Sequence, residues 1–376
     1  MKDVFIVADN ILSPVGITTE ENFAALKQGL SGVKEQHRSS WWEQPFYASL
    51  FNDNDLLANK DSISTKFEQL LIASVTEALQ HTSIDTSSNR TILIISSTKG
   101  NISLVENEVF SPALKERIAL HTSAKLVGAH FNCANQPLVV SNACISGILA
   151  ILAGKRLIQT GQYDHAVVVG ADVISKFVLS GFQSFQAISS AACKPFDAAR
   201  NGINLGEGAA TVILSATKNN DTQITVTGGS VSNDANHISG PSRTGEELYQ
   251  AIQKAMDDAD ISSNDINLIS AHGTATIYND EMEALAISLA GLQAVPVNSL
   301  KEYYGHTLGA AGIIESIISI QSLKENLIIP SMGYTQSGVS KPLNIATELQ
   351  TASLNNCLKT ASGFGGCNAA ILYHKA

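Results

Sequence analysis

Cys144 is the residue whose surroundings best suit nucleophilic chemistry. It follows an apolar segment that predicts a strand, and apolar residues at helical spacing begin at Ile145. A thiol at such a strand-to-helix turn meets the free N–H groups and the positive dipole end of the helix, which favour the thiolate and lower its pKa. The same N–H groups can stabilise an oxyanion during acyl transfer, and Gly147 and its small neighbours leave room for a substrate. Without further support, however, a buried cysteine is more often an inert small hydrophobe.

Two histidines and a lysine follow predicted strands in the second half of the chain. His272 lies in the segment Ala271-His-Gly-Thr-Ala-Thr276, and Lys301 and His306 lie just before a run of small residues that starts a helix. In open α/β sheets, ligands bind beyond the carboxyl ends of the strands. Together with Cys144 these residues supply a nucleophile, hydrogen-bond donors for an enolate or oxyanion, and a positive charge. The set predicts acyl-transfer chemistry.

Eight short runs rich in β-branched residues predict the strands that position these side chains. Several are apolar on both faces, which is typical of buried, largely parallel strands covered by helices. Strands that alternate with helical segments indicate βαβ units and a layered α/β architecture. The predicted strands are Val4–Val7, Thr91–Ile95, Val139–Ser141, Ala166–Val169, Thr211–Leu214, Ile224–Thr227, Leu268–Ala271 and Ala369–Tyr373.

The chain also repeats a pattern of strand, polar loop and small-residue helix. One copy begins at Pro137 and leads to the nucleophile, and the other begins at Pro296 and leads to the lysine. Duplicated halves or chance likeness between βα units can both explain the repeat, and we favour duplication. The halves are placed at residues 1–222, with the cysteine, and 223–376, with the histidines, the lysine and a glycine-rich loop. Because no low-complexity linker divides them, we expect one shared core.

Composition excludes several classes of protein. The chain has 376 residues, of which 44% are hydrophobic and 15% charged, and its net charge of -10 argues against a nucleic-acid-binding surface. Its five cysteines are widely spaced and odd in number, which suits free thiols in a reducing compartment. The N-terminal apolar run is too short for a signal peptide, and no apolar stretch is long enough for a membrane span. We therefore expect a cytoplasmic protein that contacts neither nucleic acid nor membrane.

Over nearly its whole length the chain resembles the β-ketoacyl-acyl-carrier-protein synthases, the elongating condensing enzymes of fatty acid and polyketide synthesis. The resemblance rests on motifs that surround the residues above and occur in the order of the family. They are Ser13-Pro-Val-Gly16, the segment at Cys144, Pro195-Phe-Asp-Ala-Ala-Arg200-Asn-Gly202, Gly206-Glu-Gly-Ala209, the segments at His272 and at Lys301 and His306, and Ser362-Gly-Phe-Gly-Gly366.

This resemblance implies a thiolase-like α/β fold of five layers, αβαβα, with two duplicated halves. It also implies that Cys144 accepts an acyl chain from its carrier. His272 and His306 would assist the decarboxylation of malonyl-carrier protein and hydrogen-bond the enolate that then attacks the thioester. Lys301 would tune the electrostatic field around His306 and pair with Glu315. The starter-type synthases use Cys-His-Asn, so His306 favours an elongating enzyme.

The family's glycine-rich loop and threonines imply further roles. Backbone N–H groups of the nucleophile and of Phe364 would form the oxyanion hole, and the Phe364 ring, between Gly363 and Gly365, would gate the acyl pocket. Thr274 and Thr276 would contact the pantetheine arm of an acyl carrier protein. The resemblance implies no cofactor and no metal beyond this carried phosphopantetheine. The acidic run from Asp280 to Glu283 is interpreted as a solvated or structural helix start.

Several positions depart from the family pattern and leave the acyl chain and the pathway open. Ser362 and Cys367 replace a usual Phe and Thr, Tyr303 and Tyr304 are bulkier than expected, and residues 32–61 align poorly. These changes hint at a specialised pathway such as polyketide or polyene pigment synthesis.

The family implies a homodimer, and a heterodimer with a related subunit stays open. The alternative function is therefore that of a chain-length-factor-like partner, which shapes the tunnel of a synthase; such partners typically lack the cysteine. A thiolase and a pure binding module are the other readings, and the second leaves the catalytic set unexplained. Carrier docking is predicted near Lys115, Arg117, Lys125, Lys194 and Arg200, because carriers are acidic.

Overall fold

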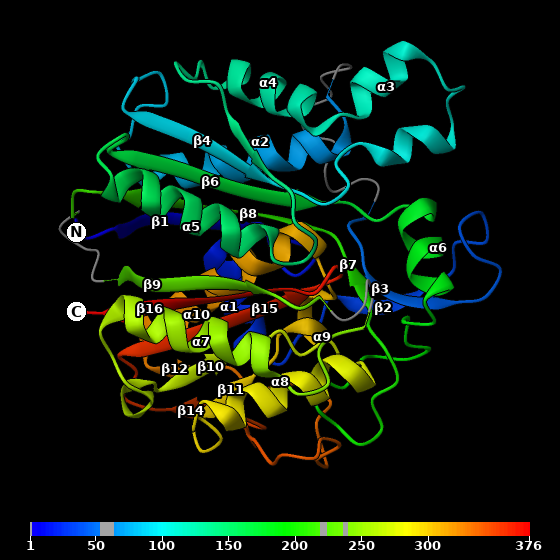
Figure 1. Ribbon diagram of the computed structural model, residues 1–376. Coiled ribbons are helices and arrows are strands. Elements are labelled where there is room, and N and C mark those ends of the chain that lie inside the picture. The colour runs from blue at the N-terminus through cyan, green and yellow to red at the C-terminus, as the bar shows by residue number, and fades with distance from the viewer. Residues whose placement is uncertain (1, 53–63, 219–223, 236–239) are drawn as a thin grey trace.

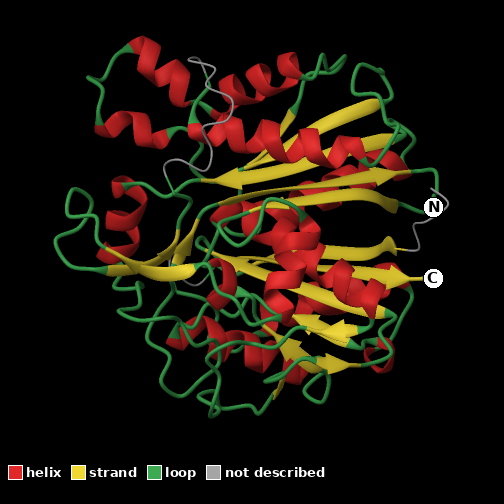
Figure 2. Cartoon of the chain, turned by 180° about the vertical axis from the view of Figure 1, so that it is seen from behind, coloured by secondary structure: helices red, strands yellow, loops and turns green. Residues whose placement is uncertain are grey.

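Five stacked layers of helices and strands, in the order αβαβα, build the molecule (Figure 1). The computed structural model describes residues 2–52, 64–218, 224–235 and 240–376. In both views of the whole chain the two termini lie close together (Figure 1, Figure 2). The predicted five-layer fold is confirmed. The predicted domain boundary between residues 222 and 223 lies outside the described residues, so the division at that point stays a prediction.

The first half of the chain supplies one outer helical layer, one side of the main sheet and part of the middle layer. Its elements are β1 (Phe5–Leu12), α1 (Thr19–Lys27), β2 (Val33–Gln36), β3 (Phe46–Ser49), α2 (Lys66–Gln80), β4 (Thr91–Ser96), η1 (Ile102–Glu106), α3 (Pro112–Ile118), α4 (Leu120–His130), β5 (Leu138–Val140), α5 (Ser146–Gln159), β6 (His165–Asp172), α6 (Lys176–Ser184), β7 (Leu205–Gly206) and β8 (Gly208–Ser215).

The second half supplies the corresponding layers on the other side. Its elements are β9 (Ile224–Asn233), α7 (Glu246–Ala259), η2 (Ser263–Asp265), β10 (Leu268–Ser270), α8 (Ile277–Leu289), β11 (Pro296–Asn298), α9 (Lys301–Tyr304), η3 (Leu308–Ala310), α10 (Ala311–Glu325), β12 (Leu327–Ile328), β13 (Asn344–Ile345), β14 (Gln350–Thr351), β15 (Asn356–Gly363) and β16 (Cys367–Lys375).

Strand order confirms the duplication. The main sheet runs β13-β11-β10-β15-β16-β9-β1-β8-β6-β4-β5, and its two sides join where Phe5 of β1 pairs with Thr225 of β9. Outward from that junction, β1, β8 and β6 pair antiparallel and β6, β4 and β5 pair parallel. On the other side β9, β16 and β15 pair antiparallel and β15, β10 and β11 pair parallel.

All eight predicted strands are present, but the expectation of a largely parallel sheet is wrong. The long strands β8 and β16 run antiparallel to both of their neighbours. Both strands are buried along most of their length, because helices cover the two faces of the sheet. These strands are therefore apolar on both faces because helices cover both faces, and not because they pair in parallel.

The middle layer carries a core shared by the two halves. Helices α5 and α10 contact each other, and each also contacts strands of both halves. The largest apolar cluster includes Ile148 and Ile151 of α5, Ile314 and Ile317 of α10, and Ile371 of β16. The expectation of a single core is met at this layer, which also brings the start of α5 next to the start of α10.

Gly147 lets the two central helices approach closely. A Cβ added there would lie 2.9 Å from Ile313 N and 3.1 Å from both Gly309 O and Gly312 Cα. The expectation that Gly147 leaves room for substrate is therefore wrong: the residue is fully buried against α10.

Gly147→Ala is expected to destabilise the protein by about 1–3 kcal/mol, because backbone atoms and not flexible side chains meet the added methyl group. Urea denaturation measures the loss. Gly181→Ala is the matched control, since Gly181 lies in α6 with no atom within 4 Å of an added Cβ. Equal stability of Gly147→Ala and the wild type would contradict the close helix contact.

Among the described residues no helix is both long and apolar enough to cross a membrane.

Candidate active site

Cys144 lies on a sharp turn between β5 and α5. Ala143 before it has a positive φ of 45°, which turns the chain directly into the helix that begins at Ser146. The Ser146 hydroxyl accepts a hydrogen bond from Asn142 N at 2.8 Å and donates to Ala143 O at 2.6 Å. These bonds fix the turn. The Cys144 side chain is buried, with 9% of the residue exposed.

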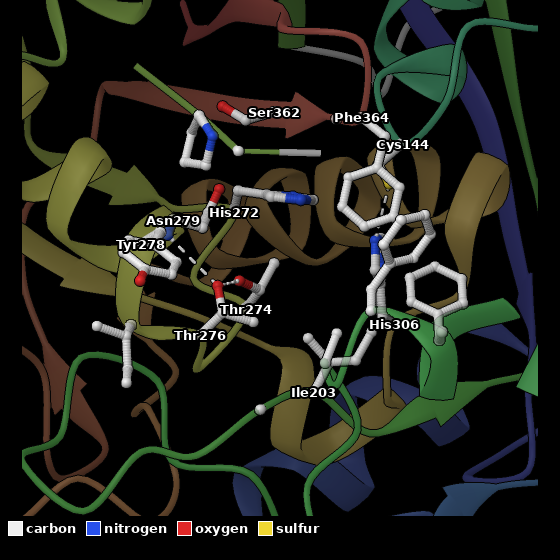
Figure 3. Close-up of a pocket in the computed structure, with 18 of the residues that line it drawn as sticks. Cys144, Ile203, His272, Thr274, Thr276, Tyr278, Asn279, His306, Ser362 and Phe364 are labelled. Carbon is white, nitrogen blue, oxygen red and sulfur yellow. Dashed lines mark hydrogen bonds between the residues drawn. The ribbon is translucent and has the colours of Figure 1, made fainter. Parts of the chain in front are cut away.

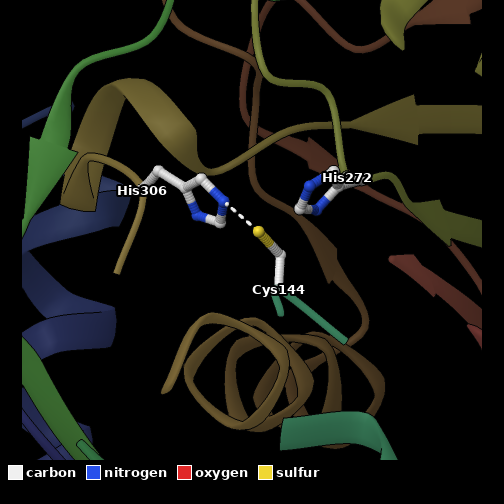
Figure 4. Close-up of side chains that lie close together, drawn as sticks. All are labelled: Cys144, His272 and His306. Carbon is white, nitrogen blue, oxygen red and sulfur yellow. Dashed lines mark hydrogen bonds between the residues drawn. The ribbon is translucent and has the colours of Figure 1, made fainter. Parts of the chain in front are cut away.

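Two imidazoles face the thiol. His306 Nε2 lies 3.0 Å from Cys144 Sγ, and the His272 and His306 rings are 5.2 Å apart and nearly perpendicular (Figure 4). One ligand atom from each of the three residues lies within 4.8 Å of the others. Such a set could also bind a thiophilic metal ion, but acyl transfer needs all three atoms free. The structure thus brings together the three side chains that the sequence placed in three separate segments.

Burial sets the protonation of this group. It lowers the pKa of both imidazoles well below the ordinary range, and the ammonium groups of Lys301 and Lys359 lower it further. His272 and His306 are therefore neutral near pH 7. Burial also raises the pKa of the Cys144 thiol to about 12. The expected lowering is wrong for the resting site, because the loss of hydration of the thiolate outweighs the attraction of nearby positive charge.

Two carboxylates hold the backbone that carries His272. Glu283 Oε1 and Oε2 accept from His272 N and Gly273 N, each at 2.8 Å. Asp280 Oδ1 accepts from Thr274 N at 2.9 Å, and burial raises the pKa of Asp280 to about 7. Of the two interpretations of this acidic run, the structural one is correct for Asp280 and Glu283 and the solvated one is wrong for them, because both side chains are fully buried. Sequence reasoning missed them as site-forming residues, although their spacing of three places them on one face of α8.

A buried ion-pair network lies behind the histidines. Lys301 pairs with Glu315 of α10, as the resemblance implies, through a very short contact. Lys359 of β15 contacts the second oxygen of the same carboxylate at 2.6 Å. The sequence analysis missed Lys359, because no motif contains it. Two ammonium groups thus share one carboxylate in a region closed to solvent.

A cavity of about 410 Å³ opens onto the thiol and both imidazoles (Figure 3). Three aromatic rings line it: the Phe364 ring lies 5.7 Å from that of Phe182 and 5.2 Å from that of Phe185. Thr274 and Thr276 line the cavity, with their hydroxyl oxygens 2.9 Å apart. A lining of aromatic rings together with two hydroxyl groups suits a long ligand that has a polar section.

The glycine loop lies directly against the nucleophile. A Cβ added at Gly363 would be 2.9 Å from Cys144 N, and Gly365 has a φ of +88°. The backbone before and after Phe364 therefore requires residues without a side chain. Phe364 itself is 38% exposed and lines the cavity.

Some of the other predicted residues are placed differently. Arg117 forms an ion pair with Glu68, and Arg200 is buried and donates to backbone carbonyls, so neither offers the free charge predicted for carrier docking. Tyr303 and Tyr304 are fully buried in the central core. Their bulk therefore fills the middle layer. Of the positions that depart from the family pattern, Ser362 does line the cavity.

Family models and known proteins match the chain over most of its length. Residues 1–220 match the model for the β-ketoacyl synthase N-terminal domain, and residues 224–335 match the model for its C-terminal domain. A putative mitochondrial 3-oxoacyl-[acyl-carrier-protein] synthase of Schizosaccharomyces pombe is 27% identical, over 100% of this chain and 99% of the relative. The 3-oxoacyl-[acyl-carrier-protein] synthase 2 of Vibrio cholerae is 27% identical, over 99% of each chain.

Solved structures agree with these matches. A ketosynthase from Xenorhabdus doucetiae, in complex with its chain length factor, superposes with a TM-score of 0.90 and 25% identity, over 100% of this chain and 98% of that one. A β-ketoacyl synthase from Burkholderia phymatum superposes with a TM-score of 0.88 and 25% identity, over 100% of both chains.

Proposed function

Because the chain belongs to the β-ketoacyl synthase family, whose members are acyl-transferring condensing enzymes, we propose that it joins an acyl group on Cys144 to malonyl-carrier protein. The product is a 3-oxoacyl thioester for fatty acid or polyketide synthesis. One observation carries the proposal: Cys144 Sγ lies 3.0 Å from His306 Nε2 at the end of a largely apolar cavity, with His272 beside it.

Acyl loading begins at the thiol. Sγ attacks the carbonyl carbon of the acyl thioester, and the thiol proton passes to the departing carrier thiolate. The raised pKa of Cys144 means that the proton leaves during the attack and not before it. Backbone N–H groups of Cys144 and Phe364 are the proposed donors to the oxyanion of the tetrahedral intermediate.

Condensation uses the two neutral imidazoles. Among the described residues Nδ1 of His272 and Nδ1 of His306 have no hydrogen-bond partner, so tautomers with the proton on Nε2 direct their N–H toward the cavity. These N–H groups bind the malonyl thioester oxygen as the carbon–carboxylate bond breaks and CO₂ leaves. The enolate carbon then attacks the acyl thioester, and the released Cys144 thiolate takes a proton from solvent.

Partners and surroundings complete the proposal. We propose that Thr274 and Thr276, which line the cavity, contact a phosphopantetheine arm, and that an acyl carrier protein delivers both substrates without a further cofactor or metal. Five free cysteines support a reducing compartment, the cytoplasm.

Two solved relatives are complexes of a ketosynthase with a chain length factor. We propose a homodimer, and native mass after co-expression with a related subunit would reveal a heterodimer.

Intact-mass analysis tests the function directly. After incubation with a panel of acyl-carrier thioesters, the wild type is expected to gain the mass of one acyl group, mapped to the peptide that contains Cys144. Addition of malonyl-carrier protein should discharge that group as a 3-oxoacyl product. An intact site that loads no acyl group from any thioester would contradict the proposal and favour the role of a partner subunit.

A further inference from the structure

Lys359 is a fully buried lysine that the proposed mechanism does not use. It lies in the middle of β15, and none of its surface is exposed. An ammonium group inside a protein is costly unless oxygen atoms replace its hydration shell. The identity of those oxygen atoms therefore shows which parts of the structure depend on it.

Four oxygen atoms surround the Lys359 ammonium. Its Nζ lies 2.6 Å from Glu315 Oε2, 2.7 Å from Thr360 O, 3.1 Å from Ala271 O and 3.2 Å from Ser270 O. An ammonium group has three N–H donors, so these four acceptors use its full capacity. The side chain thereby connects α10, β15 and the end of β10.

These acceptors belong to the walls of the active site. Ala271 directly precedes His272, and Thr360 leads along β15 to the glycine loop. The Thr360 hydroxyl donates to Glu283 Oε1 at 2.6 Å, and the same oxygen accepts from His272 N. Two independent connections thus run from the Lys359–Thr360 pair to the backbone of His272.

We propose that Lys359 is a positioning residue for the enolate-binding imidazoles. Its ammonium holds the Ala271–His272 backbone and the strand that ends in the glycine loop at a fixed distance from Glu315. The inference rests on the proposed function, and it concerns malonyl decarboxylation and condensation more than acyl loading, because Cys144 is held by its own turn.

Charge adds a second consequence. The ammonium groups of Lys359 and Lys301 both disfavour protonation of His272 and His306. Removal of one positive charge raises the pKa of the imidazoles. Because decarboxylation requires neutral imidazoles, the acid limb of its rate against pH then moves to higher pH. The titratable or charged groups around the two rings are Cys144 before α5, Glu283 of α8, Lys301 of α9, Glu315 of α10 and Lys359 of β15.

Lys359→Met in the full-length protein tests the inference. The turnover number for condensation is expected to fall roughly 10–100-fold with KM for malonyl-carrier protein within about threefold, because misplacement of a catalytic group slows the reaction and not binding. Loading of Cys144, followed by intact mass, should stay within about threefold of the wild type. The acid limb of decarboxylation should move to higher pH.

Lys155→Met is the matched control for loss of a buried lysine. Lys155 of α5 is 2% exposed and donates to Thr227 O and Asp258 Oδ2, away from the site. It should lower the melting temperature as Lys359→Met does, yet keep wild-type turnover and pH profile. If Lys359→Met does not accumulate in folded form, Lys359→Gln carries the same test, since it also removes the charge.

The outcomes separate the two proposals. A wild type that loads and condenses while Lys359→Met keeps its turnover and acid limb overturns the role of Lys359 alone. An equal loss of turnover in Lys155→Met also overturns it, because the effect would then be one of stability. A wild type that neither loads nor decarboxylates overturns the proposed function, and the role of Lys359 with it.

Discussion

Cys144→Ala is expected to abolish acyl loading and to reduce condensation by about a thousandfold or more, because no other group can carry the acyl chain. Malonyl decarboxylation should remain measurable in this variant. The donors for the enolate are His272 and His306, and neither depends on the thiol for its position. Intact mass measures loading, and release of CO₂ from malonyl-carrier protein measures decarboxylation.

Cys193→Ala is the matched control for this experiment. Cys193 is also a buried thiol, and burial raises its pKa to about 12 as well, but it does not line the cavity. The control should load acyl groups at the wild-type rate. Acyl loading that persists in Cys144→Ala, or that disappears in Cys193→Ala, would assign the nucleophile to another residue.

Glu315→Leu is expected to lower the free energy of unfolding by about 3–5 kcal/mol, because it leaves Lys301 and Lys359 as uncompensated buried charges. Urea denaturation at neutral pH measures this loss. The two ammonium groups hold the pKa of Glu315 below its ordinary value of 4.5. Its contribution is therefore present above about pH 4.5 and is lost as the pH falls through the lower native-state pKa. The difference between wild type and variant should shrink in acid.

Glu302→Gln separates charge from burial in this test. Glu302 neighbours Lys301 and is also buried, but burial raises its pKa to about 7, so it is already partly neutral at that pH. Its neutral isostere should change the free energy of unfolding by less than about 1 kcal/mol. A loss in Glu302→Gln as large as that in Glu315→Leu would contradict the special role of the shared carboxylate.

The sequence allowed prediction of the strands whose side chains are apolar throughout, and it failed where a charge interrupts the pattern. β15 was missed because Asn356, Lys359 and Ser362 break its apolar run. In the structure Lys359 is nevertheless buried, since four oxygen atoms from three separate segments surround it. No local pattern can reveal an ammonium site built from β10, β15 and α10, because it exists only after the elements pack.

The candidate site shows the same division. Cys144 and His272 could be predicted because each follows the end of a strand, and strand ends meet at one edge of a sheet, whereas His306 follows β11 only after the short helix α9. The protonation of the thiol could not, because it depends on how completely the folded protein excludes water. For Asp280 and Glu283 the sequence left a solvated and a structural role open for a related reason: a carboxylate in a sequence does not show whether backbone N–H groups will surround it.

The close contact between α5 and α10 has an evolutionary consequence. Cys144 lies in the first half of the chain and His272 and His306 lie in the second, so neither half contains the whole candidate site. Substitutions at the contact between the two halves should then be selected against as strongly as substitutions in the interface of an obligate dimer. Substitutions at Gly147 are expected to be rejected, because an added Cβ meets backbone atoms of Gly309, Gly312 and Ile313 that no substitution at those positions removes. Chimeras that combine halves from different relatives should therefore be active only when both parents keep glycine at positions 147, 309 and 312.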